Sequence, residues 1–145
     1  MKIIVGSDHR GVQLKAPVLA LLSSLGHEVT DIGADQADKR VDYTDYAFGV
    51  ADGVAAGAFE RGVLICSSGI GMSVAANRVR GVRAALCRTL DDARLSRSHN
   101  DANVLCLGQS VTSVEDALAI VRLWLAGPFE GGRHQARVDK LDAHG

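Results

Sequence analysis

The sequence predicts a single α/β domain over residues 1–145, in which a five-stranded parallel sheet carries helices on both faces in a three-layer, Rossmann-like arrangement. Two observations support this prediction. Short apolar segments alternate with longer segments of helical periodicity along the chain. The apolar segments are continuous runs, which is typical of parallel strands that are buried on both faces. We expect the flavodoxin-like strand order 2-1-3-4-5, whose topological switch point lies between strands 1 and 3.

The first half of the chain predicts two pairs of strand and helix. Residues 2–5 and 28–32 are short runs with the β-branched residues that strands favour. Residues 13–24 repeat apolar side chains at helical spacing, and this helix ends before Gly26, because glycine commonly terminates a helix. Residues 44–58 show the same helical spacing and form the second expected helix.

The second half predicts three more strands, each followed by a helix. The strands are expected at residues 63–66, 82–87 and 104–107, and the helices at residues 73–78, 90–98 and 114–126. Gly127 and Pro128 stop the last of these helices, since proline cannot continue the helical hydrogen bonding. The tail from about residue 130 is polar, and a further helix is expected from His134 onward.

Composition and charge exclude several classes of function. The net charge is -1 and no basic cluster with interleaved aromatic residues occurs, so the electrostatic signature of a nucleic-acid-binding protein is missing. No apolar run approaches the ~20 residues of a membrane span, and the first apolar run is too short for a signal peptide. The three cysteines lie far apart without metal-ligand spacing, so neither a disulfide framework nor a zinc site is indicated. We therefore expect a cytoplasmic protein.

The most informative segment lies between the third expected strand and the helix that follows it. It reads Cys66-Ser67-Ser68-Gly69-Ile70-Gly71-Met72-Ser73. Backbone N–H groups in such a glycine turn are unpaired, so they can hold a phosphate or stabilise an enolate-like oxyanion beside the Cys66 thiol. A glycine-rich turn that follows a buried core cysteine is an equally good interpretation of the segment alone.

Polar residues also follow the first strand. Because ligands bind at the carboxyl ends of strands beside a switch point, Asp8 and His9 are expected near Cys66. Asp8 can accept hydrogen bonds from sugar hydroxyls, and His9 can donate to an anion. The alternatives are that Asp8 caps a helix and that His9 is a solvated loop residue.

Two further polar segments fall elsewhere. His99 and Asn100 lie just before the fifth strand, on its amino side. In one subunit His99 would therefore face away from Cys66, so it is either structural or serves a neighbouring subunit. Arg133 and Arg137 stand four residues apart on one face of the last helix, a spacing that suits a phosphate clamp, although such pairs are usually solvated.

With these segments in view, the whole chain resembles the type B ribose-5-phosphate isomerases and the related galactose-6-phosphate and allose-6-phosphate isomerases. The resemblance rests on five segments in order, at residues 7–11, 42–47, 66–78, 95–104 and 130–135. It implies an aldose–ketose isomerisation of a phosphorylated sugar through a cis-enediolate, without a metal or other cofactor. It also implies a homodimer with two sites shared between its subunits, and leaves open whether dimers pair into tetramers.

The resemblance assigns roles to individual residues. Cys66 matches the general base that moves a proton between C1 and C2, and Ser68 matches the hydroxyl that helps to shift protons between O1 and O2. His99, supplied by the partner subunit with Asn100, matches the acid–base group that opens the sugar ring. The other matches bind the substrate: the amides of Ser67, Gly69, Ile70 and Gly71 at the enediolate oxygen, Asp8 and Tyr43 at the sugar hydroxyls, and His9, Arg133 and Arg137 at the phosphate.

The chain departs from the family pattern at a few positions. Ser67 stands where glycine is more frequent, and Ser110 where many members have an arginine that reaches the substrate phosphate. Without this arginine, a tetrose or hexose phosphate is an alternative to ribose 5-phosphate. Met72 stands where one branch of the family carries a glutamate base, so the thiol branch is the better match.

Two other classes of protein are alternatives. A cysteine phosphocarrier also uses a thiol followed by a glycine-containing anion loop, but there the cysteine follows the first strand, whereas Cys66 follows the third. A non-catalytic sugar-phosphate-binding protein could share the same fold. Only the acid–base groups Cys66, Ser68 and His99 argue against that second alternative.

Overall fold

One parallel sheet organises the chain. The computed structural model describes residues 1–145, and its five strands lie in the order β2-β1-β3-β5-β4. All four strand pairs are parallel, as the continuous apolar runs predict. The strands are β1 (Lys2–Ser7), β2 (Glu28–Asp31), β3 (Arg61–Cys66), β4 (Ala84–Leu86) and β5 (Val104–Gly108).

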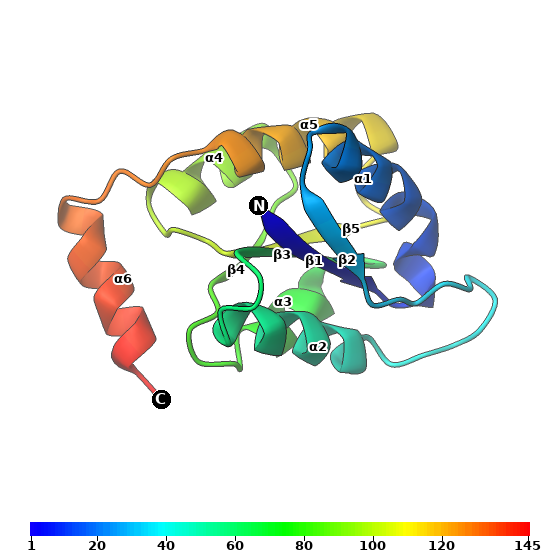
Figure 1. Cartoon of the computed structure of the whole chain (residues 1–145), viewed down its shortest axis with the longest axis horizontal. Helices are drawn as coiled ribbons and strands as arrows, with labels where there is room; N and C mark the ends of the chain where they lie inside the picture. Colours follow the sequence, from blue (N-terminus) through cyan, green and yellow to red (C-terminus); the bar gives the residue numbers. More distant parts are fainter.

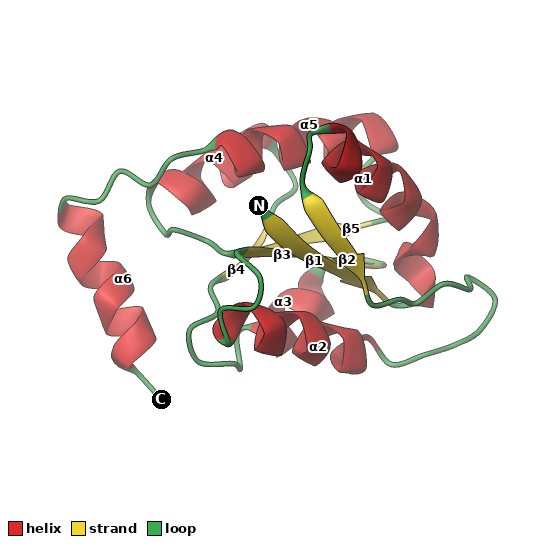
Figure 2. Cartoon of the chain, viewed as in Figure 1, coloured by secondary structure: helices red, strands yellow, loops and turns green.

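Helices cover both faces of the sheet, so the predicted three-layer α/β class is confirmed (Figures 1 and 2). Three helices pack on one face: α1 (Val12–Ser24), α4 (Leu90–Ser98) and α5 (Val114–Ala126). Two helices, α2 (Tyr43–Ala55) and α3 (Ile70–Ala76), pack on the other. A short 3₁₀ helix, His9–Gly11, joins β1 to α1. None of the helices has the length and apolar composition needed to cross a membrane.

Each face of the sheet has its own apolar core, because successive side chains of a strand point to opposite faces. On β3, Val63 and Ile65 join the core under α1, α4 and α5, which includes the fully buried Trp124. Leu64 and Cys66 join the core under α2 and α3. The Cys66 side chain therefore points to the face of the sheet from which α3 departs.

The order of the last two strands differs from the predicted 2-1-3-4-5, because β5 lies inside the sheet and β4 at its edge. The burial of the two strands explains the difference. All five residues of β5 are buried, whereas β4 has only three residues, each half-exposed. The Asn77 side chain covers the free edge of β4 by bonding both the N–H and the carbonyl of Ala84. The predicted switch point between β1 and β3 is confirmed.

Local capping decides how well the predicted boundaries agree with the structure. Helices α4 and α5 have the predicted limits, because Thr89 and Ser113 cap their first turns with side-chain hydrogen bonds. Helix α2 ends three residues earlier than predicted, next to Gly57 with φ 77°. Helix α3 starts three residues earlier than predicted, immediately after Gly69.

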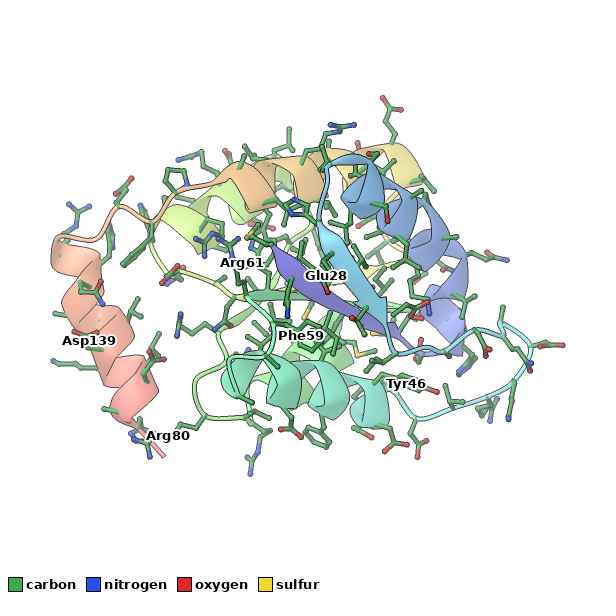
Figure 3. All side chains as sticks on the ribbon, viewed as in Figure 1. Glu28, Tyr46, Phe59, Arg61, Arg80 and Asp139 are labelled. Carbon is green, nitrogen blue, oxygen red and sulfur yellow. The ribbon has the colours of Figure 1, made fainter.

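The last helix, α6 (Arg133–Ala143), begins one residue before the predicted position and stands apart from the three layers (Figure 1). Polar contacts tie its end to the body of the molecule. The Arg83 guanidinium donates to the Asp142 carboxylate at 2.8 Å, and Arg80 Nε donates to the Asp142 carbonyl. Figure 3 shows Arg80 beside the end of this helix. Between α6 and residues 77–85 lies a cavity of about 650 Å³.

Candidate active site

Cys66 is the last residue of β3 and begins the loop that leads into α3. Its side chain is 5% exposed, and the N–H of Gly69 donates to Sγ at 3.2 Å. Gly69 has φ 80°, a left-handed conformation that glycine adopts without strain. A Cβ at this position would also lie 2.6 Å from Leu86 and 3.0 Å from the carbonyl carbon of Leu107. The turn around the thiol therefore depends on glycine.

The loop leaves backbone N–H groups unbonded. The amides of Ser67 and Gly71 make no hydrogen bond within the chain, and the first helical bond of α3 runs from the Ser73 N–H to the Gly69 carbonyl. The other two predicted amide donors are used inside the loop: Gly69 bonds the Cys66 sulfur and Ile70 bonds the Ser68 hydroxyl at 3.2 Å. The loop thus holds a thiol, a hydroxyl and free amide donors within a few residues.

The segment after β5 packs tightly against this loop. A Cβ at Gly108 would lie 2.5 Å from both the carbonyl carbon and the oxygen of Ser68. The N–H of Gln109 donates to the Cys66 carbonyl at 2.9 Å, and the N–H of Ser110 donates to the Ser67 carbonyl at 3.0 Å. The Ser110 hydroxyl donates to the same carbonyl and lies 3.0 Å from the Ser67 hydroxyl. The two serines that depart from the family pattern are therefore in direct contact.

The end of β1 brings Asp8 and His9 to the same edge of the sheet. The Asp8 N–H donates to the carbonyl of Ile65, the residue before Cys66. The Asp8 carboxylate accepts from the Arg10 N–H at 2.9 Å, which confirms that Asp8 caps a helix. His9 is not merely solvated, because its Nδ1 accepts from the Val41 N–H at 3.2 Å. This bond leaves Nε2 of His9 for another partner.

Tyr43 completes this group from the first turn of α2. Its ring packs against the start of α3, where a Cβ at Gly71 would lie 2.9 Å from Cε2 of the ring. The tyrosine is 40% exposed, so its hydroxyl remains accessible from solvent. The carboxyl edge of the sheet therefore gathers side chains from β1, α2 and β3.

The other predicted residues lie at the amino edge. His99 follows the last residue of α4, and Asn100 is exposed beside it, before the start of β5. Arg133 and Arg137 are exposed on α6. The length of β3 alone places the two edges about 16 Å apart, at a rise of ~3.3 Å per residue. In one chain His99 therefore faces away from Cys66, as its position before β5 predicts.

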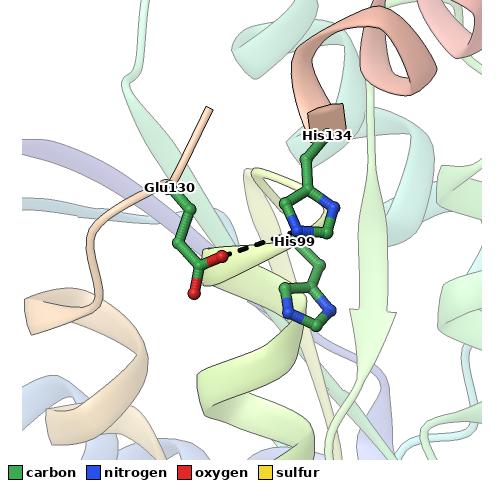
Figure 4. Close-up of side chains that lie close together, drawn as sticks. All are labelled: His99, Glu130 and His134. Carbon is green, nitrogen blue, oxygen red and sulfur yellow. Dashed lines mark ion pairs between the residues drawn. The ribbon is translucent and has the colours of Figure 1, made fainter. Parts of the chain in front are cut away.

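His99 is not isolated at that edge. Its ring stacks on the ring of His134, with a centroid distance of 4.2 Å and an interplanar angle of 14° (Figure 4). Nε2 of His134 lies 3.5 Å from a carboxylate oxygen of Glu130. The donor atoms of the three side chains lie within 4.8 Å of one another. The nearly parallel rings direct their nitrogen lone pairs side by side and not toward a common point, so this geometry does not suit a metal ion.

Comparison with known proteins identifies the family. The family model described as Ribose/Galactose Isomerase matches residues 3–141. The chain belongs to the ribose/galactose isomerase family. This membership confirms the family resemblance expected from the sequence.

Named relatives are similar to this chain over almost their whole length. Ribose-5-phosphate isomerase B of Escherichia coli is 46% identical over 98% of this chain and 95% of the relative. The solved ribose-5-phosphate isomerase B of Clostridium thermocellum is 47% identical, with a TM-score of 0.95 over 98% of this chain and 95% of that one. The Mycoplasma genitalium enzyme, solved with bound ribulose-5-phosphate, is 42% identical, with a TM-score of 0.94 over 97% and 93%.

The structure divides the predicted site residues into two groups. One group meets at the carboxyl edge: Asp8, His9, Tyr43, Cys66, Ser67, Ser68, Gly69, Ile70 and Gly71. The second group lies at the amino edge: His99, Asn100, Arg133 and Arg137. Glu130 and His134 were not among the predicted site residues. Their segment carries part of the family resemblance, but a sequence does not indicate that the His134 ring is buried against His99.

We predict that Gly108→Ala lowers kcat on the sugar phosphate by about 10-fold or more, because its Cβ would displace the Ser68 backbone and with it the loop donors. Steady-state kinetics and urea unfolding measure the effect. The matched control is Gly26→Ala, which has φ 84° and open space around its Cα. This control should lose stability through backbone strain and keep kcat. Full activity of Gly108→Ala would contradict the packing argument.

Proposed function

We propose that this chain interconverts ribose 5-phosphate and ribulose 5-phosphate through a cis-enediolate, in sites that two subunits build together. The observation that carries the proposal is the loop after β3, where a thiol, a hydroxyl and unbonded amides lie together. The relatives named as ribose-5-phosphate isomerases support the choice of substrate.

The loop supplies the groups that the reaction needs. In the open-chain aldose, the Cys66 thiolate takes the proton from C2, and the electron pair of that bond forms the enediolate. The free amides of Ser67 and Gly71 stabilise the negative oxygen, because preorganised donors act where charge develops. Ser68 passes the O2 proton to O1, and Cys66 returns its proton to C1 to give the ketose. The protons balance without a metal or other cofactor.

Ring opening and phosphate binding use the second group of residues. A pentose 5-phosphate closes into a furanose, which must open before C1 and C2 can react. His99, with Asn100 beside it, supplies the acid–base group for this opening. Arg133 and Arg137 bind the phosphate with charge-assisted hydrogen bonds, together with the free Nε2 of His9.

The separation of the two groups supports a homodimer. Two copies related by a two-fold axis can each bring His99 and α6 to the Cys66 loop of the other, which creates two equivalent sites. Apolar side chains that one copy leaves exposed suit such a contact. Ile70 and Val74 on α3 lie beside the Cys66 loop, and Leu141 lies on α6. Helix α6 lies outside the three layers, where a neighbouring copy can contact it (Figure 1).

The contact between Ser67 and Ser110 favours a second candidate substrate. The Ser110 hydroxyl is bonded to the loop, and it adds no positive charge for a phosphate. A tetrose or hexose phosphate would place its phosphate at a different distance from C1. An aldose phosphate of another chain length is therefore the alternative substrate for the same reaction.

The burial of Cys66 weighs against the phosphocarrier alternative. A phosphocarrier must present its thiol to partner proteins, whereas Cys66 is 5% exposed and bonded to the loop. The binding-protein alternative gives no reason for a thiol and a hydroxyl in the same loop as the free amides. All three cysteines are unpaired and buried, which suits the reducing cytoplasm that we infer as the location.

Cys66→Ala should lower kcat by about 10²–10⁴-fold, since the enediolate cannot form without a base, and should leave ribulose 5-phosphate binding nearly unchanged. Turnover and calorimetric binding measure the two effects. Cys87→Ala is the matched control, because burial raises the pKa of the Cys87 thiol to about 11 and keeps it protonated near neutral pH. Unchanged turnover of Cys66→Ala would show that Cys66 is not the general base.

Mixing inactive Cys66→Ala and His99→Asn subunits should restore activity if sites are shared. Each mixed dimer has one site with both changes and one intact site, so random exchange gives about one quarter of the wild-type activity. Native mass spectrometry confirms exchange, and kinetics gives the recovery. Proven exchange without recovery would show that each chain builds its own site.

A panel of four-, five- and six-carbon aldose phosphates tests the substrate. We expect ribose 5-phosphate to have a kcat/KM about 10-fold or more above the others, because the relatives named as ribose-5-phosphate isomerases support this substrate. A higher value for the tetrose or hexose phosphate would select the alternative substrate.

A further inference from the structure

The orientation of the His99 ring depends on one neighbour. No side chain of the protein hydrogen-bonds to this ring, and only the backbone N–H of His99 is bonded, to the Leu95 carbonyl at 2.9 Å. The contact that the ring does make is the stack with His134, at 4.2 Å and 14° (Figure 4). A flat ring packed face to face restricts rotation about the side-chain bonds of its partner.

His134 is itself firmly held. It is 6% exposed, and its N–H donates to the Gly131 carbonyl at 3.0 Å. Gly131 and Gly132 have φ of 67° and 55°, so they turn the chain and direct the first residues of α6 back toward α4. The Glu130 N–H donates to the Ser98 carbonyl at 3.1 Å, which ties this turn to the residue before His99.

The surroundings of His134 favour the neutral form of its ring. Burial, the neighbouring His99 and the cationic Arg133 and Arg137 lower its pKa below the usual value, and Glu130 opposes them. Nε2 of His134 is fully buried and has no hydrogen-bond partner, so this nitrogen does not reach a substrate. Two charged imidazoles at this separation would also repel each other. His134 is therefore suited to support another group and not to transfer protons.

We propose that His134 is a positioning residue for His99. Its ring is the platform that holds the His99 imidazole in the orientation needed to open the sugar ring. The inference rests on the proposed function, in which His99 is the acid–base group of ring opening. It adds a residue to which the proposed reaction assigns no role.

The test compares two substrates. His134→Ala should lower kcat/KM on ribose 5-phosphate by about 10-fold or more, and should change it by less than about 2-fold on a tetrose 4-phosphate, which cannot close into a furanose.

His134→Phe keeps a flat ring and should recover most of the activity on ribose 5-phosphate. Gln135→Ala is the control, since Gln135 is exposed on the same turn and its side chain bonds only Asp139. If His134→Ala does not fold, His134→Leu is measured instead, because leucine removes the flat ring but keeps a similar side-chain volume.

A second measurement follows the stack without activity. In NMR spectra, His134→Ala should remove the ring-current shift of the His99 ring protons, and His134→Phe should retain one. The protonation midpoint of His134 should rise in His99→Asn and fall in Glu130→Gln, because His99 lowers and Glu130 raises its pKa. Unchanged chemical shifts of the His99 ring protons in His134→Ala would overturn the inference that His134 positions His99.

The outcomes separate this inference from the proposed function. If His99→Asn loses more activity on ribose 5-phosphate than on the tetrose phosphate and His134→Ala does not, the inference fails and the proposed function stands. Equal losses of His134→Ala on both substrates show a purely structural role and also overturn the inference. If His99→Asn loses equally on both substrates, the ring-opening role fails, and the inference falls with it even where NMR detects the stack.

Discussion

The parallel pairing of β3 with β1 and β5 is the constraint on which the candidate site depends. The hydrogen-bond ladder continues past the strand ends: the Asp8 N–H bonds the Ile65 carbonyl, and the Gln109 N–H bonds the Cys66 carbonyl. The loops after three strands are thereby fixed against one another before any side chain is considered. Because the peptide groups set the positions, the loop around Cys66 tolerates serine at position 67 as long as its amide keeps its place.

The same constraint prevents one chain from completing the proposed site. In a parallel sheet, each crossover helix returns the chain to the amino edge, so a residue between α4 and β5 must lie a strand's length from Cys66. A second copy removes this difficulty, because a two-fold axis can place the amino edge of one sheet beside the carboxyl edge of the other. In the proposed dimer, catalysis and association are therefore linked through the position of His99.

Local sequence patterns predict well where helices and strands lie. They predict less well which elements lie beside one another. Side-chain caps on Thr89 and Ser113 mark helix starts that can be read from the sequence, and α4 and α5 agree with the prediction. The exchange of β4 and β5 in the sheet could not be predicted, because both read as apolar runs and only their packing reveals which is the edge. The contact of Ser67 with Ser110 and the stack of His134 on His99 join residues 43 and 35 positions apart, so no local pattern contains them.

The two groups of residues suit the two negative charges that the proposed reaction must distinguish. The phosphate is charged throughout, so permanently charged guanidinium groups can bind it without favouring any step. The enediolate is charged only near the transition state, and the loop offers it neutral amides that gain most when that charge appears. In the proposed dimer, the separation of the arginines on α6 from the amides after β3 favours a single productive orientation of the substrate.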